Sequence, residues 1–255
     1  MKKQKNAPQI LPREEWPYEV PENWVWTRLS TLLSEIKNGT TIKQDKSGNG
    51  FFITRIESLQ RQTIDFSRLG TIVDSNAIKE NDWYKINDIA LSHINSAEQV
   101  GKTAIITETM LPLVHGMNLL RLRFVSQLAP HYFYYYSQSF QYRDAVLQRI
   151  NMAVNQVSIN QKQIGSIELP LPPLPEQQRI IARIESLFAK LDAAAEKLRR
   201  ICVGNDVRIS QCVGEIDLVK KSILARAFRG LLGTNDPKEE SAERWLKEKN
   251  SQSKT

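Results

Sequence analysis

Three histidines, His93, His115 and His131, are the side chains of this 255-residue chain best suited to proton transfer near neutral pH. They are scattered along the sequence, and the dispersed acidic residues suggest no carboxylate pair for acid–base chemistry. The sequence contains no glycine-rich phosphate loop, no Gly-x-Ser-x-Gly elbow and no His-Glu-x-x-His helix. It also lacks a Cys-x-x-Cys pair, so we predict neither a catalytic centre nor a metal site, and no cofactor of the chain's own.

The formal net charge is +7, which is compatible with a polyanionic partner. Residues 1–170 hold 19 basic and 16 acidic side chains and the remainder hold 16 and 12, so neither part is a basic arm. Charge alone therefore leaves a nucleic-acid partner open. No stretch approaches the roughly 18 apolar residues of a membrane helix, and MKKQKNAPQ has no apolar signal run. We expect a soluble, cytoplasmic protein with no membrane partner.

Leu169–Ile184, reading LPLPPLPEQQRIIARI, carries the strongest structural signal. Its first three prolines exclude a helix and favour an extended segment, because each fixes φ and removes a donor. Pro175 and Glu176 then suit the first turn of a helix. From there a coiled-coil seam is predicted by the 4-3-4-3 spacing of Ile180, Ile184, Leu187, Leu191, Ala194, Leu198 and Ile201.

A second heptad series follows with an offset of four residues, at Ile209, Cys212, Ile216, Val219 and Ile223. Gly204-Asn205 at the offset could break the helix, but we favour one continuous helix from Glu176 to Arg229, about 80 Å long. A rod of that length cannot bury its seam against one domain. We therefore predict that a second polypeptide supplies the partner helix.

The part before the prolines has an α+β pattern, which predicts a globular mixed α/β domain followed by the long coiled-coil-forming helix. Residues 24–29 are expected to form a first strand or a docking segment. Further short strands are expected at 51–55, 71–73, 89–94, 103–107 and 119–124, and a helix from Pro130 to about Ile150. The aromatic cluster Tyr132–Tyr136 could stack on bases, but we favour a core role because Tyr132, Phe133 and Tyr136 fall on one helical face. The expected divisions are a flexible lead-in at 1–21, the globular domain at 22–170, and the proline-rich collar with the long helix at 171–232. A short helix with a disordered tail is expected at 233–255.

Several segments resemble the DNA-specificity (S) subunits of type I restriction-modification systems. LPLPPLPEQQRIIARIESLFAKLDAAAEKL and LVKKSILARAFRGLL resemble that family's conserved region, and PENWVWTRLSTLLSEIKNGTT resembles the start of its target-recognition domain. INDIALSHINSAEQVGKTAII and HGMNLLRLRF resemble its central strands. The resemblance extends from about Trp16 to Leu246.

The resemblance implies a non-catalytic scaffold that binds double-stranded DNA and docks methyltransferase (modification) subunits along its helical spacer. Those partners would bring S-adenosylmethionine, and a separate restriction/translocase subunit would bring ATP and Mg. Typical members have two recognition domains and two spacer helices, whereas this sequence has one of each. It is expected to act as a homodimer or with a second half-subunit, reading a two-part inverted repeat, or else to be a truncated, silent cassette.

Given this resemblance, residues that read DNA should be polar or basic side chains on loops, because these match base edges and phosphates. The DNA-binding candidates are Lys37, Asn38, Thr40, Thr41, Lys43, Arg55, Ser92, His93, Asn95, Arg149, Asn151, Asn155 and Gln156. For each one the alternative is a solvated or turn-forming residue. For the whole chain the alternative is a coiled-coil protein–protein adaptor whose head binds no nucleic acid.

Overall fold

The structure is a computed structural model that describes residues 10–45, 48–153, 156–201 and 207–252. The chain divides into two compact units, which are described separately. The sheet unit comprises Arg28–Ser137 and Tyr142–Glu168, and the helical unit comprises Met1–Thr27, Gln138–Gln141 and Leu169–Thr255. The mixture of strands and helices, followed by a long helix, confirms the predicted α+β class.

An antiparallel four-stranded sheet in the order β2-β10-β7-β9 forms the centre of the sheet unit. Its strands are β2 (Leu33–Asn38), β10 (Leu119–Phe124), β7 (Ile89–Ser92) and β9 (Thr103–Ile105). Smaller sheets join β11 (Asn151–Ala153), β12 (Gln156–Ser158) and β8 (Ile94–Asn95), then β3 (Phe51–Ile53) with β6 (Gly70–Ile72), and β4 (Leu59–Gln60) with β5 (Thr63–Ile64). Each strand expected from the sequence in this unit is present, whereas β2, β4, β5, β11 and β12 were not predicted.

The helices of the sheet unit are short and place aromatic side chains in its core. They are α1 (Leu29–Leu32), α2 (Ala129–Tyr136), most of α3 (Phe140–Leu147) and α4 (Gln161–Gly165). Tyr132, Phe133 and Tyr136 are buried, and the ring of Tyr142 meets Phe133 edge-on at 5.7 Å. This confirms the core role of the aromatic cluster. The single helix expected from Pro130 to Ile150 is in fact two helices.

Within the described ranges there are also six 3₁₀ turns, at Arg13–Glu15, Ile56–Ser58, Phe66–Arg68, Ser75–Ala77, Glu80–Asp82 and Glu108–Met110. Two of them begin at an aspartate whose carboxylate accepts a backbone N–H two residues on, at Asp65 and Asp74. Such local bonds compete with regular structure and favour turns.

In the helical unit, β1 (Val25–Arg28) pairs with β13 (Glu168–Leu171) as a two-stranded sheet. Of the flexible lead-in expected at residues 1–21, residues 1–9 lie outside the described part, and residues 10–21 pack against the rest of the unit. Leu11 and Val20 are buried, and the Leu11 N–H donates to the carbonyl of Trp26 at 2.8 Å. The apolar side chains between the prolines give residues 10–21 enough buried surface to pack.

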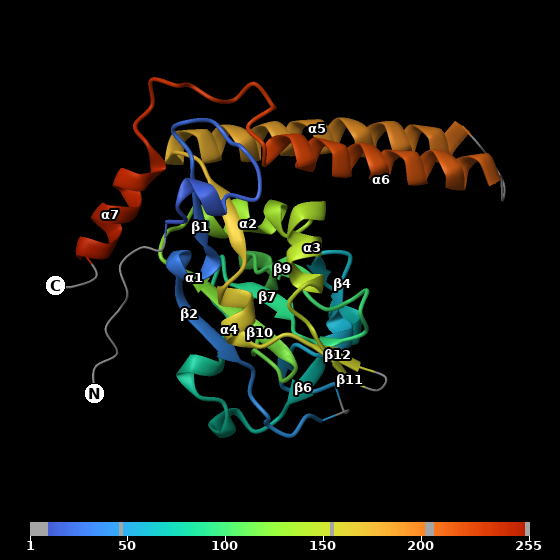
Figure 1. The fold of residues 1–255 in the computed structure, drawn as a ribbon. Coiled ribbons are helices and arrows are strands. Elements are labelled where there is room, and N and C mark those ends of the chain that lie inside the picture. The colour runs from blue at the N-terminus through green and yellow to red at the C-terminus, as the bar shows by residue number, and fades with distance from the viewer. Residues whose placement is uncertain (1–9, 46–47, 154–155, 202–206, 253–255) are drawn as a thin grey trace. The chain divides into compact units, whose positions relative to one another are not determined.

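Helices α5 (Leu174–Ile201) and α6 (Val207–Ala227) lie side by side as a hairpin (Figure 1). The Lys220 ammonium lies 2.5 Å from the Asp192 carboxylate and 5.1 Å from the centroid of the Phe188 ring. The favoured continuous helix from Glu176 to Arg229 is therefore wrong. Gly204-Asn205 lies outside the described residues, but the helix that packs against α5 is α6 of the same chain, and not a helix of a second polypeptide.

The predicted seam residues differ in burial along the hairpin. Ile180 and Ile184 are buried, whereas Leu198 is 37% and Val219 45% exposed. Leu187, Leu191, Ile216 and Ile223 are half-buried. The side chains of Ile201 and Ile209 lie outside the described part. The seam is thus well covered near the start of α5 and only partly covered farther along.

The first turn of α5 is fixed to both ends of the helical unit by the buried carboxylate of Glu176. Its Oε2 accepts the Trp24 indole N–H at 2.7 Å and the Asn235 amide at 2.9 Å, and its Oε1 accepts the Thr234 hydroxyl at 3.3 Å. Arg179 binds the carboxylate of Glu239 through two bonds of 2.7 and 2.8 Å. These contacts order the segment before α7 (Ala242–Gln252), the short helix expected in the tail.

Candidate nucleic-acid interface

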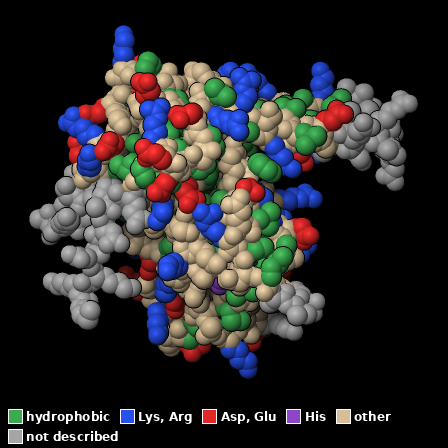
Figure 2. Space-filling view, viewed as in Figure 1, with side chains coloured by type: hydrophobic (Ala, Val, Ile, Leu, Met, Phe, Trp, Pro, Cys, Tyr) green, Lys and Arg blue, Asp and Glu red, His purple; other side chains and the backbone are tan. Residues whose placement is uncertain are grey.

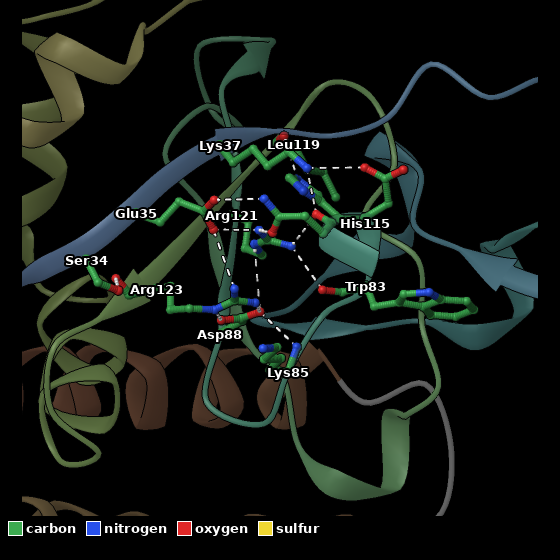
Figure 3. Close-up of polar contacts among 12 residues, drawn as sticks. Ser34, Glu35, Lys37, Trp83, Lys85, Asp88, His115, Leu119, Arg121 and Arg123 are labelled. Atoms are coloured by element: carbon green, nitrogen blue, oxygen red, sulfur yellow. Dashed lines mark hydrogen bonds and ion pairs between the residues drawn. The ribbon is translucent and has the colours of Figure 1, made fainter. Parts of the chain in front are cut away.

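Strands β2 and β10 place one pair of like charges and one pair of opposite charges across from each other. In their antiparallel register Arg121 lies opposite Lys37, and Arg123 lies opposite Glu35. Two directly opposed cations repel, so the Arg121–Lys37 pair requires nearby acceptors. The loop of residues 79–88 provides them, and the resulting network of contacts is drawn in Figure 3.

Arg121 is fully buried at the centre of this network. Its guanidinium donates to the Asn81 and Trp83 carbonyls at 3.1 and 2.9 Å, to the Asn81 side chain at 2.8 Å and to Glu35 at 2.5 Å. Burial raises the pKa of Glu35, but the hydrogen bond and charge of Arg121, with help from Asn81 and Arg123, outweigh it and hold that pKa below its usual value. Glu35 is therefore ionised at neutral pH and neutralises part of the buried charge.

Asp88 closes the other end of the 79–88 loop. Its carboxylate is almost fully buried and accepts two bonds from the Arg123 guanidinium, at 2.8 and 2.7 Å. It also accepts the backbone N–H of Lys85 at 2.8 Å. The hydrogen bond to Asp88 raises the pKa of Arg123. Two-point pairing of this kind fixes orientation as well as distance, so the loop has one defined position on β10.

Asp82 links the same loop to β2. Its carboxylate is almost buried and lies 3.2 Å from the Lys37 ammonium, which also donates to the Asn81 carbonyl at 2.6 Å. The backbone carbonyl of Asp82 accepts the His115 N–H at 2.8 Å. Asp82 therefore connects Lys37 with the buried histidine.

His115 in turn holds the segment that follows β2. Burial lowers the pKa of His115 to about 3, so the ring is neutral and its Nε2 is placed 2.9 Å from the Leu119 carbonyl, to which it donates. The carbonyl of His115 accepts the Thr40 N–H at 2.8 Å. A Cβ on Gly116 would lie 1.8 Å from the Thr54 carbonyl oxygen, so only glycine permits this close packing.

We call residues Asn38–Lys43 the reading segment, because four predicted DNA-binding residues lie on it. Asn38, Thr41 and Lys43 are exposed, and Thr40 is half-buried against His115. Lys37, immediately before the segment, is engaged by Asp82 and Asn81 instead of facing solvent freely. The structure thus brings one exposed cation and several hydroxyl and amide groups together on a rigidly supported loop.

Another predicted site residue, Arg55, follows β3 and is exposed. Its guanidinium pairs with the Glu57 carboxylate at 2.7 Å, an exposed ion pair that a phosphate could replace at small cost.

The candidates near β7 and β8 make contacts within the protein. Ser92 is buried, and its hydroxyl accepts the Asn95 amide at 3.2 Å. The Asn95 side-chain oxygen accepts the Ser96 N–H at 2.8 Å. Burial lowers the pKa of His93, against an opposing hydrogen bond to the backbone of Asn118. Ser92 and Asn95 therefore shape this turn, and a base could reach them only after these bonds break.

The candidates near β11 and β12 are divided. Arg149 donates to Glu168 at 2.5 Å, to the Ser166 hydroxyl at 3.3 Å and to the Ala145 carbonyl at 3.0 Å, so its guanidinium has a structural role. Asn151 exchanges two amide bonds with Gln163, at 3.1 and 3.3 Å. Gln156 is exposed at the start of β12, and Asn155 lies outside the described residues.

The supporting residues Asn81, Asp82, Asp88 and Arg121 were not predicted from the sequence. The alternation in LRLRF places Arg121 on the face opposite Leu120, where a solvent-exposed arginine is expected. A cover over that face could not be inferred, because the acceptors come from a loop about 40 positions earlier. The one sequence feature that pointed to these acceptors was the group of acidic and amide residues in KENDW, residues 79–83.

Among the described residues, no group of three or more His, Cys, Asp and Glu side chains could hold a metal ion. Within the same ranges, no helix combines the length and apolar character needed to span a bilayer. Basic and acidic side chains are interspersed over the face seen in Figure 2, without one large basic patch.

Residues 21–201 match the family model described as the type I restriction modification DNA specificity domain. The match covers the whole sheet unit together with α5. The chain therefore belongs to this DNA-specificity family.

Individual relatives agree with this assignment. A type I restriction enzyme specificity subunit of Methanocaldococcus jannaschii is 42% identical over 184 residues, which cover 70% of this chain and 42% of that protein. The EcoKI specificity subunit of Escherichia coli K12 is 27% identical over 86% of this chain and 46% of its own length. The chain thus spans about half the length of the curated relatives it matches.

Solved structures show the same fold. The HsdS subunit from Thermoanaerobacter tengcongensis aligns with a TM-score of 0.51 and 15% identity, over 72% of this chain and 49% of that one. A chain from a structure titled for complex assembly and conformational transition of the type I R-M system aligns with a TM-score of 0.52 and 21% identity, over 86% and 49%.

Proposed function

We propose that this chain supplies one DNA-recognition domain of a type I restriction-modification complex and sets the sequence that the complex recognises. The observation that carries the proposal is the family match over residues 21–201, which includes the reading segment and the first long helix.

In this proposal the reading segment contacts duplex DNA. The exposed Lys43 ammonium would neutralise a phosphate, while Asn38 and Thr41 would offer hydrogen bonds to base edges. The buried network beneath the segment supports this division of roles, because base readout requires side chains held in one position before DNA arrives.

We further propose that the chain is not itself an enzyme and holds no cofactor. Methyltransferase subunits that bind S-adenosylmethionine would dock on the helical unit, and a restriction/translocase subunit would supply ATP and Mg chemistry. The sequence offers no catalytic motif of its own, which is consistent with this division. A complex acting on cellular DNA would place the chain in the cytoplasm.

Pairing with a second copy, or with another half-subunit, is part of the same proposal. The hairpin leaves apolar side chains exposed at Leu198, Leu218 and Val219, with exposed fractions of 37%, 63% and 45%. A twofold pair would present two recognition domains to an inverted repeat. Sedimentation at micromolar concentration tests this point, and a stable monomer would exclude the pair.

Selection of a randomised duplex pool by the full chain, alone and with its methyltransferase subunits, tests the central proposal. We expect enrichment of one motif and an affinity that falls steeply as salt rises, because phosphate contacts release counterions. Lys43→Ala should reduce the slope of log affinity against log salt concentration. Lys190→Ala should not change it; Lys190 is an exposed lysine on α5. A salt-independent interaction with no enriched motif would favour the coiled-coil adaptor instead.

A further inference from the structure

We infer that Lys37 is a positioning residue that holds the reading segment in place, and that it does not contact DNA phosphate. This inference rests on the proposed function. It reverses the role expected for Lys37 from the sequence, where a lysine beside the Asn38-Gly39 turn is expected to bind a DNA phosphate.

The Lys37 ammonium is already committed to partners in the protein. It donates to the Asn81 carbonyl at 2.6 Å and pairs with Asp82 at 3.2 Å, and its side chain is only 31% exposed. A phosphate contact would have to break both bonds and leave the almost buried Asp82 carboxylate without its cation. Removing one partner of a largely buried charge pair is strongly unfavourable.

The partners of Lys37 are themselves held in one place. Asn81 is fixed through its side chain and its carbonyl by the fully buried Arg121. Asp82 accepts the backbone N–H of Lys79 at 3.2 Å through its carboxylate. Lys37 therefore binds a loop that is itself fixed, and it holds β2 against that loop immediately before the reading segment.

The same contacts continue into the reading segment. The carbonyl of Asp82 accepts the N–H of His115, and the carbonyl of His115 accepts the N–H of Thr40, both at 2.8 Å. The reading segment is thus attached to the 79–88 loop at two places. Lys37 makes the first attachment just before the segment, and the second runs from Thr40 through His115 to Asp82. Loss of either attachment should loosen Asn38–Lys43 while the rest of the sheet stays folded.

Hydrogen exchange in the free full-length chain tests the positioning role without DNA. In Lys37→Met and in Asp82→Asn, amides of residues 38–43 should exchange about tenfold faster than in the original chain, because a charge-assisted bond is lost. Lys220→Met is the matched control, since Lys220 also forms a partly exposed ion pair, with Asp192. Unchanged exchange at 38–43, or equal acceleration in the control, would overturn the inference.

DNA binding supplies the second arm, with the duplex selected by the original chain and a shuffled duplex as probes. Lys37→Met should lower the preference for the selected duplex about tenfold and leave the salt slope unchanged, because no phosphate contact is lost. A slope reduced by about 0.9 with the preference intact would identify Lys37 as a phosphate contact and refute the inference. If the original chain prefers no duplex, the proposed function fails, while the exchange measurement still decides whether Lys37 holds the segment.

Discussion

Replacing Glu176 tests whether its buried carboxylate fastens the two ends of the helical unit. Glu176→Ala removes the acceptor for the Trp24 indole, the Asn235 amide and the Thr234 hydroxyl. An unsatisfied buried donor costs about 1–3 kcal/mol, and Trp24 is fully buried whereas the other two are partly exposed. We expect the alanine variant to lose about 2–4 kcal/mol of unfolding free energy.

Glu176→Gln is the matched comparison because it keeps the shape of the side chain. Its amide oxygen can accept from Trp24 and Asn235, and its amide nitrogen can donate to the Thr234 hydroxyl. We therefore expect a change within about 1 kcal/mol at pH 7. Urea unfolding followed by tryptophan fluorescence measures both variants. A glutamine variant as unstable as the alanine variant would refute the argument that hydrogen-bond acceptance is what matters.

The pH dependence of the same pair gives a second check. Burial raises the pKa of Glu176 above its usual 4.5, although the hydrogen bonds from Asn235, Trp24 and Thr234 oppose this. The stability contributed by the raised pKa is complete below the unfolded value and is lost as pH rises through the folded value. The original chain should therefore lose stability relative to Glu176→Gln as pH rises from 4.5. A difference that is constant across this range would show that the pKa is not raised.

Three further outcomes follow from the contacts described above. Lys43→Ala should weaken binding to all duplexes and reduce the salt slope by about 0.9, measured by fluorescence anisotropy at several salt concentrations. Arg121→Met should cost about 3–5 kcal/mol of unfolding free energy, because it leaves the Asn81 and Trp83 carbonyls without their donor and removes the closest cation of Glu35; Glu35→Gln should then cost less in this variant than it does alone. Tyr18→Phe should cost about 1 kcal/mol through the lost bond to the Phe228 carbonyl, measured by thermal unfolding.

The sequence predicted the inner strands of the main sheet because they are short apolar runs bounded by turn residues. Ile89–Ser92 and Leu119–Phe124 are examples, and both lie at the centre of the sheet. Strand β2 was missed because LSEIKN mixes charges with apolar residues. Its place at the edge of the sheet depends on pairing with β10, which is about 80 positions later. Such pairing is decided by contacts far apart in sequence, which local propensity does not report.

The candidate site was only partly predictable for a related reason. Residue type identified Asn38, Thr41 and Lys43, which the structure leaves exposed. It could not separate Lys43 from Lys37, because the difference lies entirely in what the 79–88 loop places beside each side chain. The same holds for Arg149, whose partners are fixed only after β13 and α3 take their positions.

The hairpin of α5 and α6 shows what a heptad pattern leaves undecided. The 4-3 spacing specifies that a helix needs an apolar partner, but it does not specify which helix provides it. A partner in the same chain is always at high effective concentration, so α6 competes strongly with any second copy for the seam of α5. A pair of chains must therefore gain its stability from surface that the hairpin leaves uncovered, and Leu198, Leu218 and Val219 are the apolar side chains in question. The case for pairing consequently depends on this exposed surface, and no longer on the length of the helix.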